Sequence, residues 1–117
     1  MGQAGDCLFC GIVAKKIPAA IVLETDKSLA FRDINPKAPV HILVIPKVHI
    51  ENLMALEAGH ADVLADIHMT IQKVARDAGA AEKGFWVAVN NGKDAGQAVA
   101  HLHYHVLSGR KLNWPPG

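Results

Sequence analysis

Three histidines near the end of the chain alternate with apolar residues. They are His101, His103 and His105, in the run His-Leu-His-Tyr-His-Val-Leu. In a strand, alternate residues point to one face and lie roughly 6.5–7 Å apart, so the three imidazoles are expected to share a face. Imidazole can donate or accept a proton, attack as a nucleophile or bind a metal near neutral pH. The spacing therefore favours chemistry over packing.

Three interpretations of these histidines remain open. The first is an ordinary solvated sheet face. The second is a metal site, although the three residues span roughly 13 Å when extended, so at most two adjacent histidines would share an ion. The third is attack by an imidazole nitrogen on phosphorus, giving a phospho-imidazole that water then cleaves. The preceding loop, residues 90–97, contains Gly92 and Gly96, and glycines allow backbone N–H groups to approach a phosphate closely.

The chain has two cysteines, Cys7 and Cys10, in a C-x-x-C pair. In a chain of intracellular character this pair favours metal or redox use over a disulfide. A thioredoxin-like redox site follows a strand and begins a helix, whereas this pair opens the chain ahead of any clear strand. The position makes the redox interpretation the weaker of the two.

Length and composition limit the classes of function. With 117 residues, half of them hydrophobic, the chain is expected to form a single domain over residues 1–117. Its formal charge of +1 comes from interspersed charges, with no basic stripe for nucleic acid. No signal-like N-terminus and no apolar run near about 18 residues is found, so no membrane association is predicted. We expect a cytoplasmic protein.

Hydrophobic periodicity predicts an α+β fold. Helical spacing predicts a short N-terminal helix and one long helix, and alternating or β-branched runs predict an antiparallel sheet of about five strands. The expected helices cover residues 6–16 and 57–78, and the expected strands cover 21–24, 28–31, 41–45, 85–90 and 101–107. The tail, residues 111–117, is expected to be irregular. His60 and His68 lie on the long helix and are expected at its surface.

The chain resembles the histidine-triad (HIT) family, whose signature is H-x-H-x-H-x-x with apolar x. It is most similar to the Hint branch of nucleoside phosphoramidate hydrolases, and the likeness covers nearly the whole chain. Phe31-Arg32-Asp33-Ile34 resembles the ribose-binding segment, and residues 41–49 resemble the central strand. Residues 90–110 are similar to the phosphate loop and triad strand, and Trp114-Pro115-Pro116-Gly117 to the C-terminal ending.

The resemblance implies roles for individual residues. His103 would be the nucleophile, and His105 would hold the phosphate or pass a proton to the leaving group, supported by His41. Asp33 would accept hydrogen bonds from the ribose hydroxyls. The purine pocket would be lined by Leu8, Phe9, Ile17, Phe31, Ile34 and Leu43, and Asn90, Gly96, Gln97, Ala98 and Val99 would surround the phosphate.

One residue departs from the branch pattern. Ala98 stands after Gly-Gln, where the branch commonly has Ser. A hydroxyl that could bond the phosphate bridge or the leaving group is therefore missing, which affects the expected rate and leaving-group preference but not the nucleophile.

The resemblance also gives the cysteine pair a second meaning. Cys7, Cys10, His49 and His101 match the positions that bind structural Zn²⁺ in zinc-bearing HIT proteins. Two cysteines and two histidines are a common donor set for structural zinc. With His101 bound to zinc, proton transfer would fall to His105.

The resemblance implies a homodimeric, cytoplasmic hydrolase of purine nucleoside phosphoramidates that yields AMP-like monophosphates through a nucleotidyl-histidine intermediate. Trp114 in the tail would reach the partner's site. One alternative is hydrolysis of dinucleoside polyphosphates, as in the Fhit-like branch. Another is a nucleotide-binding or protein-interaction module in which turnover is incidental.

Overall fold

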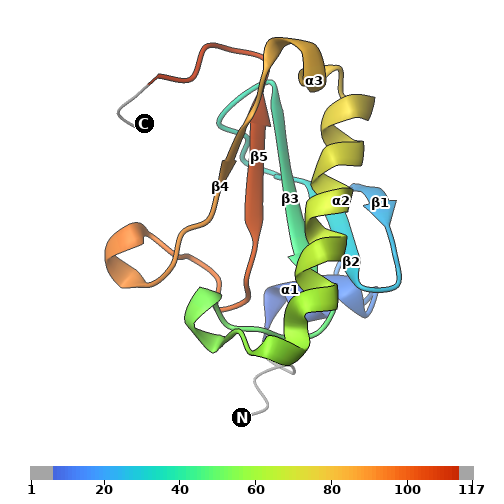
Figure 1. Cartoon of the computed structure of the whole chain (residues 1–117), viewed down its shortest axis with the longest axis vertical. Helices are drawn as coiled ribbons and strands as arrows, with labels where there is room; N and C mark the ends of the chain where they lie inside the picture. The colour runs from blue at the N-terminus through green and yellow to red at the C-terminus, as the bar shows by residue number, and fades with distance from the viewer. Residues whose placement is uncertain (1–6, 114–117) are drawn as a thin grey trace.

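A five-stranded antiparallel sheet forms the centre of the molecule. The computed structural model describes residues 7–113. The strands are β1 (Ile21–Glu24), β2 (Ser28–Arg32), β3 (Val40–Pro46), β4 (Trp86–Ala88) and β5 (Tyr104–Ser108), in the order β1-β2-β3-β5-β4 (Figure 1). The fold is α+β, as the sequence predicted, and β4 is an edge strand.

Helices α1 and α2 lie on opposite faces of the sheet. The helical segments are α1 (Leu8–Val13), α2 (Ala61–Asp77) and α3 (Ala80–Lys83), with short 3₁₀ turns at η2 (Leu53–Ala55), η3 (Ala58–His60) and η4 (Lys93–Ala95). The long helix α2 runs across one face (Figure 1). Within residues 7–113, no helix combines the length and apolar character needed to cross a membrane.

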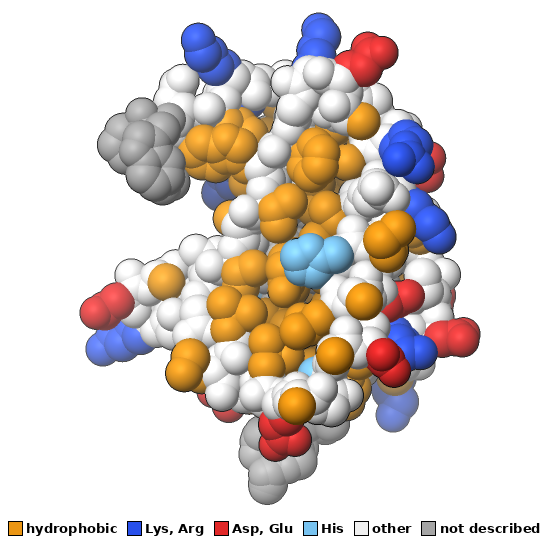
Figure 2. Space-filling model, viewed as in Figure 1, with side chains coloured by type: hydrophobic (Ala, Val, Ile, Leu, Met, Phe, Trp, Pro, Cys, Tyr) orange, Lys and Arg blue, Asp and Glu red, His pale blue; other side chains and the backbone are white. Residues whose placement is uncertain are grey.

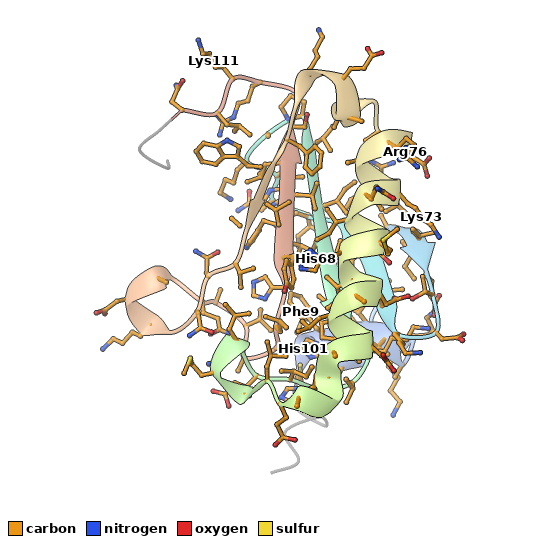
Figure 3. All side chains as sticks on the ribbon, viewed as in Figure 1. Phe9, His68, Lys73, Arg76, His101 and Lys111 are labelled. Carbon is orange, nitrogen blue, oxygen red and sulfur yellow. The ribbon has the colours of Figure 1, made fainter. Side chains whose placement is uncertain are left out.

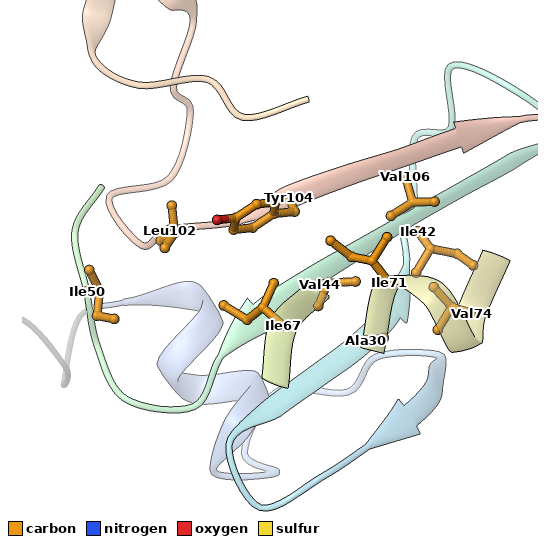
Figure 4. Close-up of a cluster of buried hydrophobic side chains, with 10 residues drawn as sticks. All are labelled: Ala30, Ile42, Val44, Ile50, Ile67, Ile71, Val74, Leu102, Tyr104 and Val106. Carbon is orange, nitrogen blue, oxygen red and sulfur yellow. The ribbon is translucent and has the colours of Figure 1, made fainter. Parts of the chain in front are cut away.

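Alternation along the strands produces two hydrophobic clusters. The cluster beneath α2 contains Ala30, Ile42, Val44, Ile50, Ile67, Ile71, Val74, Leu102, Tyr104 and Val106 (Figure 4). The cluster beneath α1 contains Phe9, Ile12, Leu29, Phe31, Leu43 and Ile45. Since successive strand residues point to opposite faces, Leu43 and Ile45 lie on the side away from α2. Both faces of the sheet are therefore buried, one beneath α2 and the other beneath α1.

The register of β3 against β5 brings two histidines to the α1 side. Leu43 pairs with His105 and His41 pairs with Leu107. The intervening Tyr104 and Val106 belong to the cluster under α2. His41 and His105 therefore lie on the same face as α1.

The predicted strand over residues 101–107 was wrong at its start, because the regular ladder begins only at Tyr104. The reason is a set of bonds outside the sheet. The amide of Leu102 donates to the carbonyl of Ile50 (2.7 Å), and that of His101 donates to Val99 (2.8 Å). Leu102 still packs under α2, so the expected alternation of faces holds.

The other boundaries differ by a few residues. The long helix begins at Ala61 because a 3₁₀ turn with a reciprocal cap between Glu57 and His60 precedes it. The N-terminal helix and β4 are shorter than predicted. Trp114 and the rest of the ending lie outside the described residues.

One face of the molecule is largely apolar. Figure 2 shows hydrophobic side chains gathered around a histidine, with acidic and basic groups at the margins. The same view in Figure 3 labels this histidine as His68. It is exposed, as the sequence predicted, and its ring meets Tyr104 edge-on at 5.5 Å.

Candidate functional site

An apolar cavity opens between α1, the sheet and the segment that leads into β5. Its volume is about 290 Å³. The lining residues are Leu8, Phe9, Ile12, Ile17, Pro18, Ala19, Phe31, Arg32, Asp33, Ile34, Leu43, Ala98, Val99, His103 and His105. The only acidic side chain among them is Asp33. This arrangement suits a flat apolar group with polar chemistry at one end.

The cavity brings together most residues that the sequence singled out. All six residues predicted to form the purine pocket line it, together with Asp33, Ala98, Val99, His103 and His105. Sequence reasoning missed Ile12, Pro18, Ala19 and Arg32. Ile12 follows Phe9 by one helical turn, and that spacing was the available signal.

Three predicted phosphate residues do not line the cavity: Asn90, Gly96 and Gln97. The side chains of Asn90 and Gln97 instead form hydrogen bonds that stabilise the loop. Asn90 Nδ2 donates to the carbonyl of Ala95 (2.6 Å). Gln97 Oε1 accepts from the amide of Gly92 (2.9 Å), and Gln97 Nε2 donates to the carbonyls of Glu51 and Val99 (2.8 and 3.0 Å).

Backbone contacts fix the tautomer of His103. Its Nδ1 lies 2.7 Å from the carbonyl oxygen of His101. A carbonyl can only accept, so Nδ1 carries the proton and Nε2 keeps a free lone pair. The ring is buried, and Phe9 packs edge-on against it at 5.1 Å. His103 thus offers one unprotonated nitrogen beside the cavity.

A relay of hydrogen bonds fixes His41 and His105 in the same way. The amide of Lys37 donates to His41 Nδ1 (3.0 Å), so neutral His41 carries its proton on Nε2. That nitrogen lies 2.9 Å from His105 Nδ1 and 3.4 Å from Asp33 Oδ2. Neutral His105 therefore carries its proton on Nε2, where it can act as a donor.

Burial keeps these histidines neutral. It is the largest cause that lowers the pKa of His105 to about 4, and the neighbouring His103 and His41 lower it further. Burial also lowers the pKa of His41, while Asp33 acts in the opposite direction. Both imidazoles are therefore neutral near pH 7, and each carries one ring proton.

Asp33, His41 and His105 place their ligand atoms within 4.8 Å of one another, which could suggest a metal site. The tautomer argues against it. A metal at His41 Nε2 needs the lone pair of that nitrogen, but the Lys37 amide requires the proton there. The trio fits proton transfer better than metal binding.

A second cluster consists of Cys7, Cys10, His49 and His101, the four residues predicted as zinc ligands. Their ligand atoms also lie within 4.8 Å of one another. His101 Nδ1 lies 3.3 Å from Cys7 Sγ and 3.6 Å from Cys10 Sγ, and His49 Nδ1 lies 3.2 Å from Cys10 Sγ. Tetrahedral zinc separates a sulfur and a nitrogen ligand by roughly 3.5 Å. The donor set and its spacing fit zinc.

The surroundings of this cluster prepare it for a cation. His101 Nε2 donates to the carbonyl of Pro46 (2.9 Å), which leaves Nδ1 free to face the sulfurs. Burial lowers the pKa of His101 to about 4, so the ring is neutral. Burial, assisted by Cys7, raises the pKa of Cys10 to about 11, so a metal must displace the thiol proton.

Known proteins resemble this chain along almost its full length. The HIT domain family model matches residues 14–112. An uncharacterized HIT-like protein of Synechococcus elongatus is 48% identical over 96% of this chain and 97% of its own. A 14 kDa zinc-binding protein of Brassica juncea is 46% identical over 96% of this chain and 100% of its own. Adenylylsulfatase HINT1 of Arabidopsis thaliana is 46% identical over 94% of this chain and 76% of its own.

Solved structures also resemble this chain in both sequence and fold. The HIT family hydrolase of Legionella pneumophila is 43% identical, with a TM-score of 0.92 over 95% of this chain and 99% of that one. A histidine triad protein of Clostridium difficile is 47% identical, with a TM-score of 0.89 over 92% of this chain and 94% of that one.

Proposed function

This chain belongs to the HIT domain family, and from that premise we propose that it is a hydrolase of purine nucleoside phosphoramidates. The observation that carries the proposal is the tautomer of His103: the carbonyl of His101 holds Nδ1–H and leaves Nε2 as a nucleophile beside the cavity. The neighbouring His105 supplies the proton that a nitrogen leaving group needs.

The cavity supports a pose for the nucleotide. The apolar walls accept a purine, and Asp33 at the polar end accepts hydrogen bonds from the ribose. Among the described residues, the amides of Ala98 and Val99 donate to no protein acceptor. Both residues line the cavity, so their amides are the proposed donors to the phosphate oxygens.

The proposed reaction has two steps. His103 Nε2 attacks phosphorus and the P–N bond to the amine breaks. His105 Nε2–H gives its proton to the departing nitrogen and is reprotonated from solvent, so that it stays neutral. The phospho-imidazole carries a positive charge, which the carbonyl of His101 stabilises through Nδ1–H. Water then attacks phosphorus, a proton passes by way of His105 to solvent and balances the one given to the amine, and the bond to His103 breaks to release the monophosphate. His41 and Asp33 keep His105 in the required tautomer.

We propose that Cys7, Cys10, His49 and His101 hold a structural Zn²⁺. When bound, zinc supplies a cross-link between the start of α1 and the segment before β5. The fit of the donor set and the Brassica juncea relative's name support this assignment. Reducing conditions in the cytoplasm, the proposed location, would keep both thiols available.

The proposal includes a single domain over residues 1–117 that forms a homodimer. The apolar face in Figure 2 and the edge position of β4 support a second copy as partner. Trp114 of the tail would approach the partner's cavity.

A second candidate substrate is adenylylsulfate. The Arabidopsis relative at 46% identity is called an adenylylsulfatase, and Ala98 lines the cavity without a hydroxyl for an amine leaving group. Sulfate leaves as an anion and needs less help from a proton donor than an amine does.

The test is a comparison of AMP release from an adenosine phosphoramidate, adenylylsulfate and a diadenosine polyphosphate. His103→Ala should abolish turnover while AMP still binds, and His60→Ala, in the surface turn before α2 and outside the cavity lining, is the matched control. Unimpaired turnover in His103→Ala would overturn the mechanism. Wild-type protein that binds AMP but releases none from any of the three would favour a binding module.

A further inference from the structure

His101 belongs to two sites at once. Its side chain is fully buried, with Nδ1 among the sulfurs of Cys7 and Cys10. Its backbone carbonyl accepts the Nδ1–H of His103 at 2.7 Å. A movement of this one residue therefore changes both the metal cluster and the orientation of the nucleophile.

The sheet does not fix the carbonyl of His101, because the regular ladder starts three residues later at Tyr104. The local backbone is held by the bond from the His101 amide to Val99 and by that from Leu102 to Ile50. The side chain adds a bond to the carbonyl of Pro46. A ligand bond at Nδ1 would complete the anchoring of this residue.

Phe9 is a second connection between the sites. Phe9 lies on α1, between Cys7 and Cys10 in the sequence, and is 4% exposed; Figure 3 labels it beside His101. Its ring meets those of His101 (5.8 Å) and His103 (5.1 Å) edge-on. Helix α1 has six residues, too few to be stable alone. Its N-cap is Cys7, whose sulfur accepts from the amide of Cys10 (3.3 Å). The Cys7 sulfur, which faces His101, thus also caps the helix that carries Phe9.

We propose that the cluster of Cys7, Cys10, His49 and His101, with zinc bound, is a positioning element for His103. It fixes the His101 carbonyl and the Phe9 ring, and these keep the His103 proton on Nδ1 and the lone pair of Nε2 toward the cavity. The inference rests on the proposed function of His103, but the tautomer can be measured without any substrate.

His49 is the ligand to change, since it contacts Cys10 and His101 and makes none of the contacts to His103 described above. His49→Asn removes a ligand, whereas His49→Cys keeps a set that zinc accepts. His60→Asn is the matched control, because His60 accepts a hydrogen bond at Nδ1 from the backbone amide of Glu57 (3.0 Å) and lies in a surface turn away from the cluster. Each protein is examined for zinc content, for the His103 imidazole tautomer by ¹⁵N NMR, and for kcat and KM on an adenosine phosphoramidate.

We expect wild type and His49→Cys to carry zinc and show the Nδ1–H tautomer. His49→Asn should lose zinc, show mixed tautomers and lose roughly 10–100-fold in kcat with little change in KM. His60→Asn should match wild type in all three. Removing zinc from the wild type with a chelator should abolish the single Nδ1–H tautomer, and adding zinc back should restore it. This experiment tests the inference even if His49→Asn folds poorly.

A zinc-free protein with an unchanged His103 tautomer would overturn the inference, whatever its kcat. Wild type that binds no zinc would overturn it too. If no protein hydrolyses the phosphoramidate, the proposed function fails, and the tautomer comparison still decides the positioning role.

Discussion

His41 Nε2 lies 2.9 Å from His105 Nδ1, and the backbone amide of Lys37 determines which of these two nitrogens carries the proton. The N–H group of Lys37, which belongs to neither histidine, thus determines which ring nitrogens of His41 and His105 carry protons. The donor at the cavity end, His105 Nε2–H, depends on a backbone group two residues beyond Asn35 in a proline-rich loop.

Removal of that amide is the first test. Lys37→Pro deletes the N–H, and the His41 proton can then move to Nδ1, so we expect kcat to fall by about 10²-fold, the size of a general-acid contribution. Lys37→Ala keeps the amide and serves as control, with activity near wild type. Steady-state kinetics of both, beside their melting temperatures, decide the matter; equal activity of the two variants would contradict the relay.

Low pH should weaken the fold through His105. Its pKa drops from 6.5 to about 4 on folding, mainly because of burial. The unfolded chain therefore binds more protons between these values, and this contribution to stability is complete above about pH 6.5 and lost as pH falls toward 4. Thermal unfolding across this range should show the loss, and His105→Gln should show a shallower dependence. Parallel curves for the two proteins would argue against it.

Gly109 should resist substitution. Its φ is +94°, and an added Cβ would lie 2.7 Å from Pro39 Cβ. We expect Gly109→Ala to lower the free energy of unfolding by about 1–3 kcal/mol. Gly59 has no atom within 4 Å of a built Cβ, so Gly59→Ala should stay within about 0.5 kcal/mol of wild type. Chemical denaturation measures both.

Ala98→Ser should alter the leaving-group preference. The residue lines the cavity, and a hydroxyl there can hydrogen-bond an amine leaving group or the phosphate. A charge-assisted bond of about 1.5 kcal/mol corresponds to roughly tenfold in kcat/KM for the phosphoramidate. Adenylylsulfate turnover should change less. Ala100→Ser, exposed and outside the cavity, is the control; a uniform gain on all substrates would exclude a leaving-group effect.

The sequence predicted the sheet face of the histidines because Leu102, Tyr104 and Val106 are apolar at alternate positions, and packing under α2 bears this out. It also predicted most of the cavity wall, although Ile12, Pro18, Ala19 and Arg32 were missed. These depend on how α1 and its following loop lie against β2, which is a tertiary property.

The tautomers could not be predicted. They depend on the carbonyls of His101 and Pro46 and the amide of Lys37. Every residue except proline has both of these backbone groups, so the pattern of side chains in the sequence does not indicate which of them will bond to a histidine. The late start of β5 has a similar cause, since the Leu102 amide bonds to Ile50, more than fifty residues earlier in the chain. Long-range backbone bonds override a local strand preference.

The side chain of Gln97 joins Gly92, Glu51 and Val99 by three hydrogen bonds. Because Gln97 is an uncharged amide, these three bonds do not depend on a titrating group. An arriving phosphate meets amides already in place, so the entropy of ordering the loop is lost during folding and not at each binding event. Capture of the nucleotide should then be limited by its encounter with the cavity, with no loop closure to wait for.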